Sequence, residues 1–185
     1  MTAHPLSQIL AESDMVLQPY DSEYREALRA AYALDQKIWE IYPHSMVGEH
    51  FELSMRHFEA HYADGNWAGF LVLVAGQVAG LSNYINADAG NKVLEIGGTY
   101  ISPEFRGTGV NGKMKRLMIN HAFANGYRRI EFRVDARNKR SQAAVLKLGA
   151  VQEGILRQNR ITWTGYVRDT VIFGLLKDEW RGSAS

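Results

Sequence analysis

A glycine-rich stretch in the second half of the chain, PEFRGTGVNGKMK at residues 103–115, has the residue types of a phosphate-binding loop. Small residues let consecutive backbone amides point toward one anion, and a helix that begins in the loop adds partial positive charge. The stretch overlaps three loop patterns that differ in the phosphate they hold. The surrounding elements must therefore decide which phosphate it binds and for what reaction.

Two of the patterns match the glycines but not their context. Gly107 and Gly112 with the following lysine fit the G-x-x-x-x-G-K loop of nucleotide hydrolases, but Met114 stands where Ser or Thr must bind Mg²⁺. Gly109 completes the dinucleotide fingerprint G-x-G-x-x-G, which needs a strand that runs directly into the first glycine. Residues 102–106 intervene here, so both interpretations are disfavoured.

The third pattern, R/Q-x-x-G-x-G/A, begins at Arg106 and Gly109 and departs at its last position, where Asn111 stands. It expects a bulged strand, a short loop and a helix that begins at once, and this order is present. Gly97 and Gly98 lie inside the preceding strand, and paired glycines in a strand indicate a bulge or a close approach of the backbone. We expect Asn111 to be tolerated because asparagine adopts left-handed backbone angles better than most residues.

The hydrophobic pattern along the chain predicts one α/β domain around a mixed sheet. Residues 1–13 are set apart as a leader, and residues 14–182 form the predicted domain. The predicted strands span about 15–18, 67–75, 78–85, 93–101, 129–135, 154–162 and 167–176, and the predicted helices about 21–41, 47–61, 107–125 and 138–149.

Composition excludes several classes of function. The 185 residues include 21 basic and 20 acidic side chains, so the net charge of +1 gives no case for a nucleic-acid or membrane partner. The absence of cysteine excludes disulfides, thiolate metal sites and a cysteine nucleophile. His57 and His61 have a metal-ligand spacing without a third ligand, so no metal is expected. A polar N-terminus and the lack of an apolar span make a cytoplasmic location the expectation.

Motifs in order along the chain resemble the GNAT superfamily of acyl-CoA-dependent N-acetyltransferases, and within it the branch of ribosomal-protein alanine and serine N-acetyltransferases. The resemblance covers about Met15 to Trp180 and is carried by EIG at 95–97, RGTGVN at 106–111, DARNKRS at 135–141, LGA at 148–150, EGILR at 153–157 and RD at 168–169. It implies a mostly antiparallel sheet with a splayed strand at 93–101 and flanking helices. It further implies acetyl-CoA as cosubstrate and an amine acceptor, and members of this branch often form homodimers.

The resemblance also implies which residues hold the cofactor. The backbone after the paired glycines and the phosphate loop would bind acetyl-CoA, together with an asparagine that also reads as a helix N-cap. The expected cofactor-binding residues are Tyr100, Ile101, Ser102, Arg106, Gly107, Thr108, Gly109, Val110, Asn111 and Asn138. Lys113, Lys115 and Arg116 are expected on a solvated helix face, with an approach to the CoA phosphates as the alternative.

For catalysis the resemblance implies Glu95 as general base acting through water, the alternative being an ordinary solvent-facing glutamate. Ser141 matches a serine near the leaving sulfur, which would protonate the thiolate or position a water; the alternative is an ordinary helix serine. Val145 stands where many members have a tyrosine that acts as the general acid. Four other tyrosines remain open for that role: Tyr84, Tyr100, Tyr127 and Tyr166.

The acceptor amine is left open: a protein N-terminus, an amino acid, a polyamine or a drug-like amine. Residues 39–51 and 159–166 are expected to flank the acceptor groove, where Glu40, Glu49 and Glu52 would attract a cationic amine. With no cysteine, the amine is expected to attack directly in a ternary complex. A non-catalytic acyl-CoA-binding or regulatory module on the same fold is the competing hypothesis.

Overall fold

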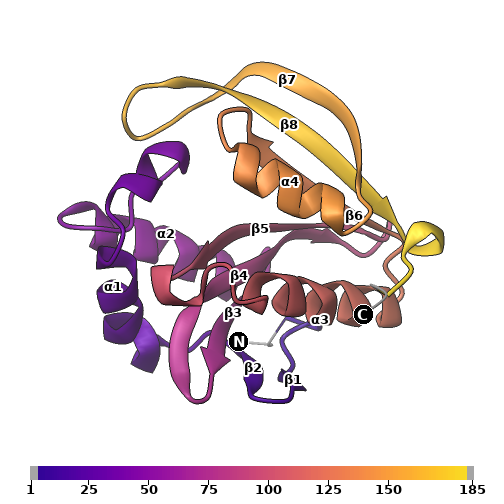
Figure 1. Ribbon diagram of the computed structural model, residues 1–185, viewed down its shortest axis with the longest axis horizontal. Coiled ribbons are helices and arrows are strands. Elements are labelled where there is room, and N and C mark those ends of the chain that lie inside the picture. Colours follow the sequence, from indigo (N-terminus) through magenta and orange to yellow (C-terminus); the bar gives the residue numbers. More distant parts are fainter. Residues whose placement is uncertain (1–3, 183–185) are drawn as a thin grey trace.

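An open sheet of eight strands, in the order β1-β2-β3-β4-β5-β6-β8-β7, forms the centre of the molecule (Figure 1). The computed structural model describes residues 4–182. All neighbouring strands are antiparallel except β5 and β6, which are parallel. The strands are β1 Leu10–Glu12, β2 Met15–Pro19, β3 Trp67–Val74, β4 Gln77–Asp88, β5 Val93–Ile101, β6 Arg129–Asp135, β7 Val151–Ile161 and β8 Val167–Leu176.

Four α-helices cover the two faces of this sheet. They are α1 Arg25–Ala33, α2 His50–Ala63, α3 Val110–Ala124 and α4 Lys139–Lys147, and 3₁₀ turns lie at Ser22–Tyr24, Lys37–Ile41, Pro103–Phe105 and Lys177–Glu179. Helices α3 and α4 lie over the face seen in Figure 1, whereas α1 and α2 pack against the sheet around β3 and β4. The predicted mixed, mostly antiparallel α/β domain is confirmed.

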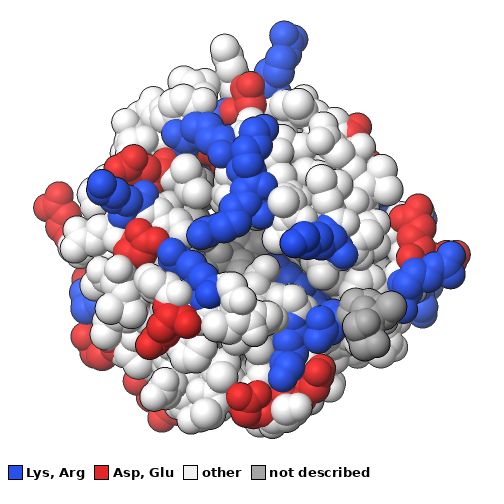
Figure 2. Space-filling view, in the orientation of Figure 1, with Lys and Arg blue, Asp and Glu red and all other residues white. Residues whose placement is uncertain are grey.

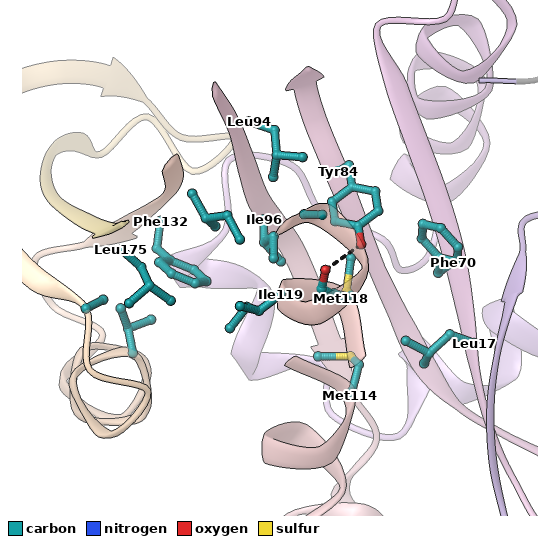
Figure 3. Packing of buried hydrophobic residues seen from close by; sticks show 14 of the residues in the cluster. Leu17, Phe70, Tyr84, Leu94, Ile96, Met114, Met118, Ile119, Phe132 and Leu175 are labelled. Carbon is teal, nitrogen blue, oxygen red and sulfur yellow. Dashed lines mark hydrogen bonds between the residues drawn. The ribbon is translucent and has the colours of Figure 1, made fainter. Parts of the chain in front are cut away.

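Each face of the sheet has its own hydrophobic core. The larger core lies between the sheet and α3, where Met114, Met118 and Ile119 meet buried side chains of β4, β5 and β6 (Figure 3). In this core the Tyr84 hydroxyl donates to the Met118 carbonyl at 2.7 Å. The smaller core packs α1 and α2 against the other face around Tyr100. Strand β5 therefore contributes side chains to both cores.

One predicted helix differs from the structure. The stretch at 21–41 was expected to be continuous, but α1 ends at Ala33 and the chain resumes as the 3₁₀ turn Lys37–Ile41. At the break, the Asp35 carboxylate accepts from Ile38 N and binds Arg106, a residue far along the chain. The Trp39 indole also donates back to Tyr32 O at 3.2 Å. These tertiary contacts fold the chain back, which local helical spacing does not report.

Part of the segment predicted as a leader joins the sheet. Residues 10–12 form the edge strand β1 against β2, and the side chain of Leu6 is buried in the larger core. Residues 1–3 of that segment lie outside the described residues. The division of the chain at residue 14 stays a prediction.

Candidate active site

The two central strands β5 and β6 separate soon after they meet. Their parallel pairing comprises Val93 with Arg129, Leu94 with Ile130, and Glu95 with Glu131. Beyond Glu95 the strand β5 continues to Ile101 beside β4 alone. One edge of β5 therefore has no strand partner along its second half, and this is the splayed strand expected at 93–101.

The paired glycines mark the point of separation. Gly98 has a φ of +58°, in the left-handed region that favours glycine. The register with β4 shifts between Leu81 and Asn83, opposite this stretch. Leu94 and Ile96 face the core under α3, and after the glycines Ile101 faces it again. Because side chains of a strand alternate, the odd spacing from Ile96 to Ile101 shows that one residue is bulged out.

A residue that sequence reasoning missed holds this bulge in place. The Asn83 side-chain amide lies 3.3 Å from Gly97 O and 3.4 Å from Gly98 O, and its carbonyl accepts from the Tyr62 hydroxyl at 2.6 Å. Asn83 is fully buried. A lone asparagine inside an apolar strand is a weak signal, because nothing in the local pattern indicates that its partner is a bulge.

Side chains from distant segments donate hydrogen bonds to carbonyls on the open edge of β5. The Tyr42 hydroxyl donates to Thr99 O at 2.6 Å, and Arg106 Nε donates to Ile101 O at 2.8 Å. Ser102 N, in contrast, donates to Ala79 O on the β4 side. Because backbone groups alternate between the two edges of a strand, the amides of Thr99 and Ile101 face the opened side. Of the three backbone positions expected to bind cofactor, the Ser102 amide is therefore already used, whereas that of Ile101 is available.

Glu95 lies at the last paired position before the opening. Its side chain is 17% exposed, and Arg133 Nε lies 3.5 Å from Glu95 Oε2. Burial raises the pKa of Glu95 to about 7, although the charge of Arg133 opposes that shift. A carboxylate with a pKa near neutrality can accept a proton at physiological pH. The side chain is partly buried, and its role as general base stays a prediction.

Gly97 leaves the space that the Glu95 carboxylate occupies. A methyl group added at Gly97 would lie 2.6 Å from Glu95 Oε1 and 3.0 Å from Ile85 Cδ1. We expect Gly97→Ala to displace the carboxylate and to lower kcat/KM for the acceptor by about 10- to 100-fold. Steady-state kinetics with the acceptor varied would measure it. Gly154→Ala, on a strand with open space around it, is the matched control and should change nothing.

The phosphate-binding loop joins the opened strand to α3. Gly107 and Gly109 have φ values of +77° and +90°, which the loop requires of its glycines. Within residues 4–182, the amides of Gly107, Thr108 and Gly109 donate to no other backbone or side-chain group. The first amides of α3 also have no partner inside the helix. The loop therefore presents a row of donors at a positive helix end, as an anion site does.

The arginine that begins the loop is turned inward. Arg106 Nη1 binds Asp35 Oδ2 at 2.5 Å, while Arg106 Nη2 is buried without a hydrogen-bond partner. Ser102 directly precedes the 3₁₀ turn Pro103–Phe105, and its Oγ is likewise buried and unpaired. Buried polar atoms without partners are costly unless a ligand or water satisfies them. These two atoms and the free loop amides fit a cofactor that carries phosphates and amides.

Asn111 does not need the left-handed backbone that was expected to make it tolerable. It lies in the first turn of α3, half-buried, and is absent from the described residues with positive φ. Any residue adopts the right-handed helical conformation, so the departure from the usual Gly or Ala costs the backbone nothing. Earlier in the loop, the Thr108 hydroxyl donates to Phe105 O at 2.7 Å and closes the loop.

Helix α4 brings the second predicted segment to the same face. Asn138 Oδ1 accepts from Ser141 N at 3.0 Å, which confirms the N-cap. Its side-chain amide group stays free for a second contact. The charge of Arg140 reaches Asp35 and lowers its pKa, although Arg106 contributes more. Figure 2 shows Lys and Arg side chains around a hollow on this face of the molecule. It is the face on which α3 and α4 lie in Figure 1.

The tyrosines considered for protonating the thiolate are mostly engaged elsewhere. Tyr84 donates to Met118 O, and Tyr100 donates to Ala31 O at 2.7 Å. Burial raises the pKa of Tyr100 to about 12 and that of Tyr84 further. Tyr166 lies under the Arg137 guanidinium, 3.7 Å from its ring centre. Ser141 is half-buried one turn into α4, so it remains the predicted group for this role.

The three basic residues on α3 do not share one solvated face. Lys113 Nζ lies 3.6 Å from Asp14, beside the turn between β1 and β2. Lys115 is 6% exposed, so the expectation of a solvated side chain is wrong for it. Lys115 is buried because of its position around the helix axis. The buried face of α3 includes Met114, Met118 and Ile119, and Lys115 lies between them. Arg116 is half-buried.

Comparison with known proteins agrees with this geometry. A model of the acetyltransferase (GNAT) domain matches residues 14–151, well over half of the chain. This chain belongs to the GNAT acetyltransferase family. It is an acetyl-CoA-dependent acetyltransferase, as its family and its neighbours of known structure support. A search of curated proteins gives no significant match.

Solved GNAT structures superpose over almost the whole chain. A GNAT-family acetyltransferase from Chromobacterium violaceum is 30% identical, with a TM-score of 0.87 over 97% of this chain and 90% of that one. RimL, a ribosomal L7/L12 α-N-protein acetyltransferase solved with coenzyme A, is 19% identical, with a TM-score of 0.78 over 93% of this chain and 99% of that one. The microcin C7 self-immunity acetyltransferase MccE, solved with acetyl-CoA and AMP, is 19% identical, with a TM-score of 0.79 over 89% of this chain and 93% of that one. The last two show the fold alone.

In this GNAT domain the two segments expected to flank the acceptor groove touch each other. The Trp163 indole donates to Trp39 O at 2.7 Å, and Trp163 N donates to Pro43 O at 3.1 Å. The β7–β8 hairpin thus reaches over to the segment that follows α1, as Figure 1 shows at its upper left. Glu52, expected to attract a cationic amine, is instead paired with Arg25 and Arg29.

The two histidines with metal-ligand spacing lie on α2 beside an aromatic side chain. His61 stacks on Trp67 and lies next to His57. Within residues 4–182, no group of three or more His, Cys, Asp or Glu side chains is arranged to hold a metal ion. Among the helices of that same span, none is both long and apolar enough to cross a membrane.

Proposed function

We propose that this protein transfers the acetyl group of acetyl-CoA directly to a primary amine, either a protein N-terminus or a small amine such as an amino acid. One observation carries the proposal. A partly buried glutamate with a pKa of about 7 lies where β5 leaves β6, and the same strand continues into a loop of free amides. A proton acceptor and an anion site joined by one opened strand suit the acylation of an amine.

Acetyl-CoA would be held by the opened strand, the loop and the first turn of α4. The loop amides of residues 107–109 and the N-terminus of α3 would bind the pyrophosphate. The amide of Ile101 and the free side-chain amide of Asn138 would bind the pantetheine arm. Bound acetyl-CoA supplies an activated acyl carbon in the form of a thioester. The protein's part is to place that carbon beside the amine and to manage two protons.

Glu95 would remove the first proton. An amine is protonated and unreactive at neutral pH, so a group of pKa near 7 must take its proton, directly or through a water. Ser141 at the start of α4 would give or relay a proton to the leaving sulfur. With no cysteine in the chain, direct attack by the amine is the supported route.

The charges around Glu95 narrow the acceptor class. Arg133, Arg160 and Arg168 all act electrostatically on its carboxylate, and Glu131 is the acidic neighbour that opposes them. Arg160 and Arg168 are directly opposed on β7 and β8. Arg133 is paired with Glu95 and Glu131, and Arg168 lies 3.9 Å from Asp135, whereas Arg160 has no carboxylate partner among the described residues. We expect this remaining positive charge to disfavour a polyamine. It suits an amine whose neighbourhood is neutral or negatively charged, such as an amino acid or an acidic N-terminal peptide.

A panel of acceptors tests the function. CoA release would be followed with free amino acids, N-terminal peptides of acidic and basic sequence, and spermidine. We expect acidic peptides or amino acids to turn over at least tenfold faster than spermidine. A thermal-shift series with acetyl-CoA, CoA, ATP and NAD accompanies it. Stabilisation by CoA with no turnover on any amine would favour the non-catalytic module, and stabilisation only by ATP or NAD would overturn the assignment of the loop.

Two further expectations come from the resemblance to the ribosomal-protein acetyltransferases. A cytoplasmic location and assembly as a homodimer both stay predictions. The function proposed above requires neither of them, because the groups that carry it come from a single chain.

A further inference from the structure

A lysine is buried beneath the opened strand. Lys115 reaches from α3 toward β5, and its Nζ donates to Thr99 Oγ1 at 2.6 Å. Ser82 Oγ lies 3.5 Å from the same nitrogen, and the two hydroxyls are 2.7 Å apart. The three side chains form a small polar cluster, called here the Lys115 cluster, between α3 and strands β4 and β5.

This lysine is poorly compensated for a buried cation. Among the described residues no carboxylate lies within 4.0 Å of its Nζ, and Phe132 is nearby, its ring centre 5.9 Å away. Burial lowers the pKa of Lys115 to about 7, and Glu95 is the charged group that opposes the shift. A methionine would fill the same space in this apolar core without the desolvation cost. Stability alone therefore does not explain a lysine here.

The partner of the lysine explains its position. Thr99 is the first residue after the bulge at Gly97 and Gly98, on the part of β5 that has lost β6. Its hydroxyl is held from the α3 side by Lys115, and its carbonyl is held by the Tyr42 hydroxyl at 2.6 Å. Thr99 is thus fixed through two different groups by two different segments. The amide that remains faces the open edge.

We propose that Lys115 is a positioning residue for acetyl-CoA: through the Thr99 hydroxyl it fixes the opened part of β5, so that the amides of Thr99 and Ile101 are held ready for the pantetheine arm. The inference rests on the proposed function, because it takes the open edge of β5 as the cofactor-binding edge. It adds that a residue outside the glycine loop, with no direct contact to the phosphates, sets cofactor affinity.

Four single variants and one double variant test this. Lys115→Met and Thr99→Val each remove one side of the hydrogen bond at nearly constant volume, and Thr99→Ser keeps the hydroxyl. Lys113→Met is the matched control, since it removes a charge from the same helix away from the cluster. The dissociation constant for CoA is measured by calorimetry without any acceptor, and unfolding by denaturant is measured alongside.

We expect Lys115→Met and Thr99→Val each to weaken CoA binding about tenfold, the size of one lost hydrogen bond in a binding edge. The double variant should be little weaker than either single one, because both remove the same interaction. Thr99→Ser and Lys113→Met should bind within about threefold of the parent protein. Lys115→Met should be as stable as the parent protein or more stable.

The pH dependence of unfolding tests the premise that Lys115 is a buried and poorly compensated cation. The pKa of Lys115 is depressed on folding from 10.5 to about 7, so the unfolded chain binds the extra proton between these values. Stability from this group is present above pH 10.5 and is lost as the pH falls through about 7. The groups that face its nitrogen are the hydroxyls of Ser82 and Thr99, and Glu95 is the charge that reaches it. The stability advantage of Lys115→Met should therefore be largest at and below about pH 7 and vanish above pH 10.5.

A dissociation constant unchanged within twofold in both Lys115→Met and Thr99→Val would overturn the proposal. So would a loss of affinity in Lys115→Met that runs parallel to a loss of stability, with Thr99→Val unaffected. If Lys115→Met fails to fold, Thr99→Val alone decides, because its hydroxyl is the group through which the lysine acts. Failure of the proposed function looks different: the parent protein would bind CoA and acetylate no amine, while the binding series above would still hold.

Discussion

Replacing Glu95 by glutamine lowers kcat by about 10²- to 10⁴-fold and leaves the affinity for CoA within about twofold of the parent value. Glutamine has nearly the same size and cannot accept the proton that an ammonium group must lose. Glu95 is the partly buried carboxylate at the point where β5 opens, and its pKa of about 7 leaves a large ionised fraction at neutral pH. Turnover in the presence of saturating acetyl-CoA is the measurement.

The pH dependence of kcat/KM in the parent protein tests the same role of Glu95 as a base. A base is active when deprotonated, so kcat/KM for the acceptor should rise with pH and level off above about 7. Glu131→Gln is the matched control, because Glu131 lies on β6 opposite Glu95 and is paired with Arg129. That variant should keep most of the activity. A Glu95→Gln protein with undiminished turnover would remove this residue from the mechanism.

Stability should respond to Glu95→Gln in the opposite sense to activity. The pKa of Glu95 is raised on folding from 4.5 to about 7, so the folded protein binds the extra proton between these values. The stability that this group contributes is present below pH 4.5 and is lost as the pH rises through about 7. Because glutamine resembles the neutral form, the variant should be more stable than the parent above pH 7. A general base whose removal stabilises the fold is a functional group and not a structural one.

Replacing Gly109 by tryptophan abolishes CoA binding, which we expect to weaken by at least 100-fold in calorimetry. Gly109 precedes α3 at a φ of +90°, and no atom lies within 4 Å of the position that a Cβ would take there. A side chain at this position therefore projects into open space, which we expect to be the space that the loop amides face. An indole placed there fills the region that a pyrophosphate needs.

The control for Gly109→Trp is Gly109→Ala. Both variants force a side chain into the left-handed region, at a cost of roughly 1–2 kcal/mol in stability. They differ only in how much of the anion site they cover, so Gly109→Ala should lose far less affinity. Equal loss of CoA binding in the two variants would mean that backbone strain, and not occlusion of the site, explains the result. Undiminished binding in Gly109→Trp would place the phosphates elsewhere.

The elements that sequence predicted well are those in which local pattern and tertiary environment agree. Strand β6 alternates buried Ile130, Phe132 and Val134 with more exposed partners, and its predicted bounds are those observed. The glycine loop was found because its requirements are local: small residues, positive φ values and a helix directly behind. The paired glycines of β5 pointed correctly to a bulge for the same reason.

The features that sequence could not give depend on distant partners. The end of α1 near Asp35 follows from its ion pair with Arg106, which lies 71 residues further along the chain. Asn83 reads as one polar residue in an apolar strand until the bulge it holds is seen. Lys115 reads as a surface lysine, because the packing of α3 on β4 and β5 that buries it exists only in the assembled fold. The roles of Glu95 and Ser141 stay predictions that the variants above test.

The short junction between β5 and β6 has a thermodynamic consequence. Among residues 4–182, three residue pairs join β1–β5 to β6, β8 and β7 as one sheet. Beyond them the two halves meet through helix packing and through the hydrogen bonds of Trp163 to the segment after α1. A cofactor bound as proposed above, to the loop before α3 and to Asn138 on α4, would contact both halves, so its binding energy would also hold them together. Linkage makes that contribution about 2.7 kcal/mol when the ligand is present at 100 times its dissociation constant. The concentration of the cosubstrate would then add to the stability of the folded enzyme, and depletion of acetyl-CoA would remove that contribution.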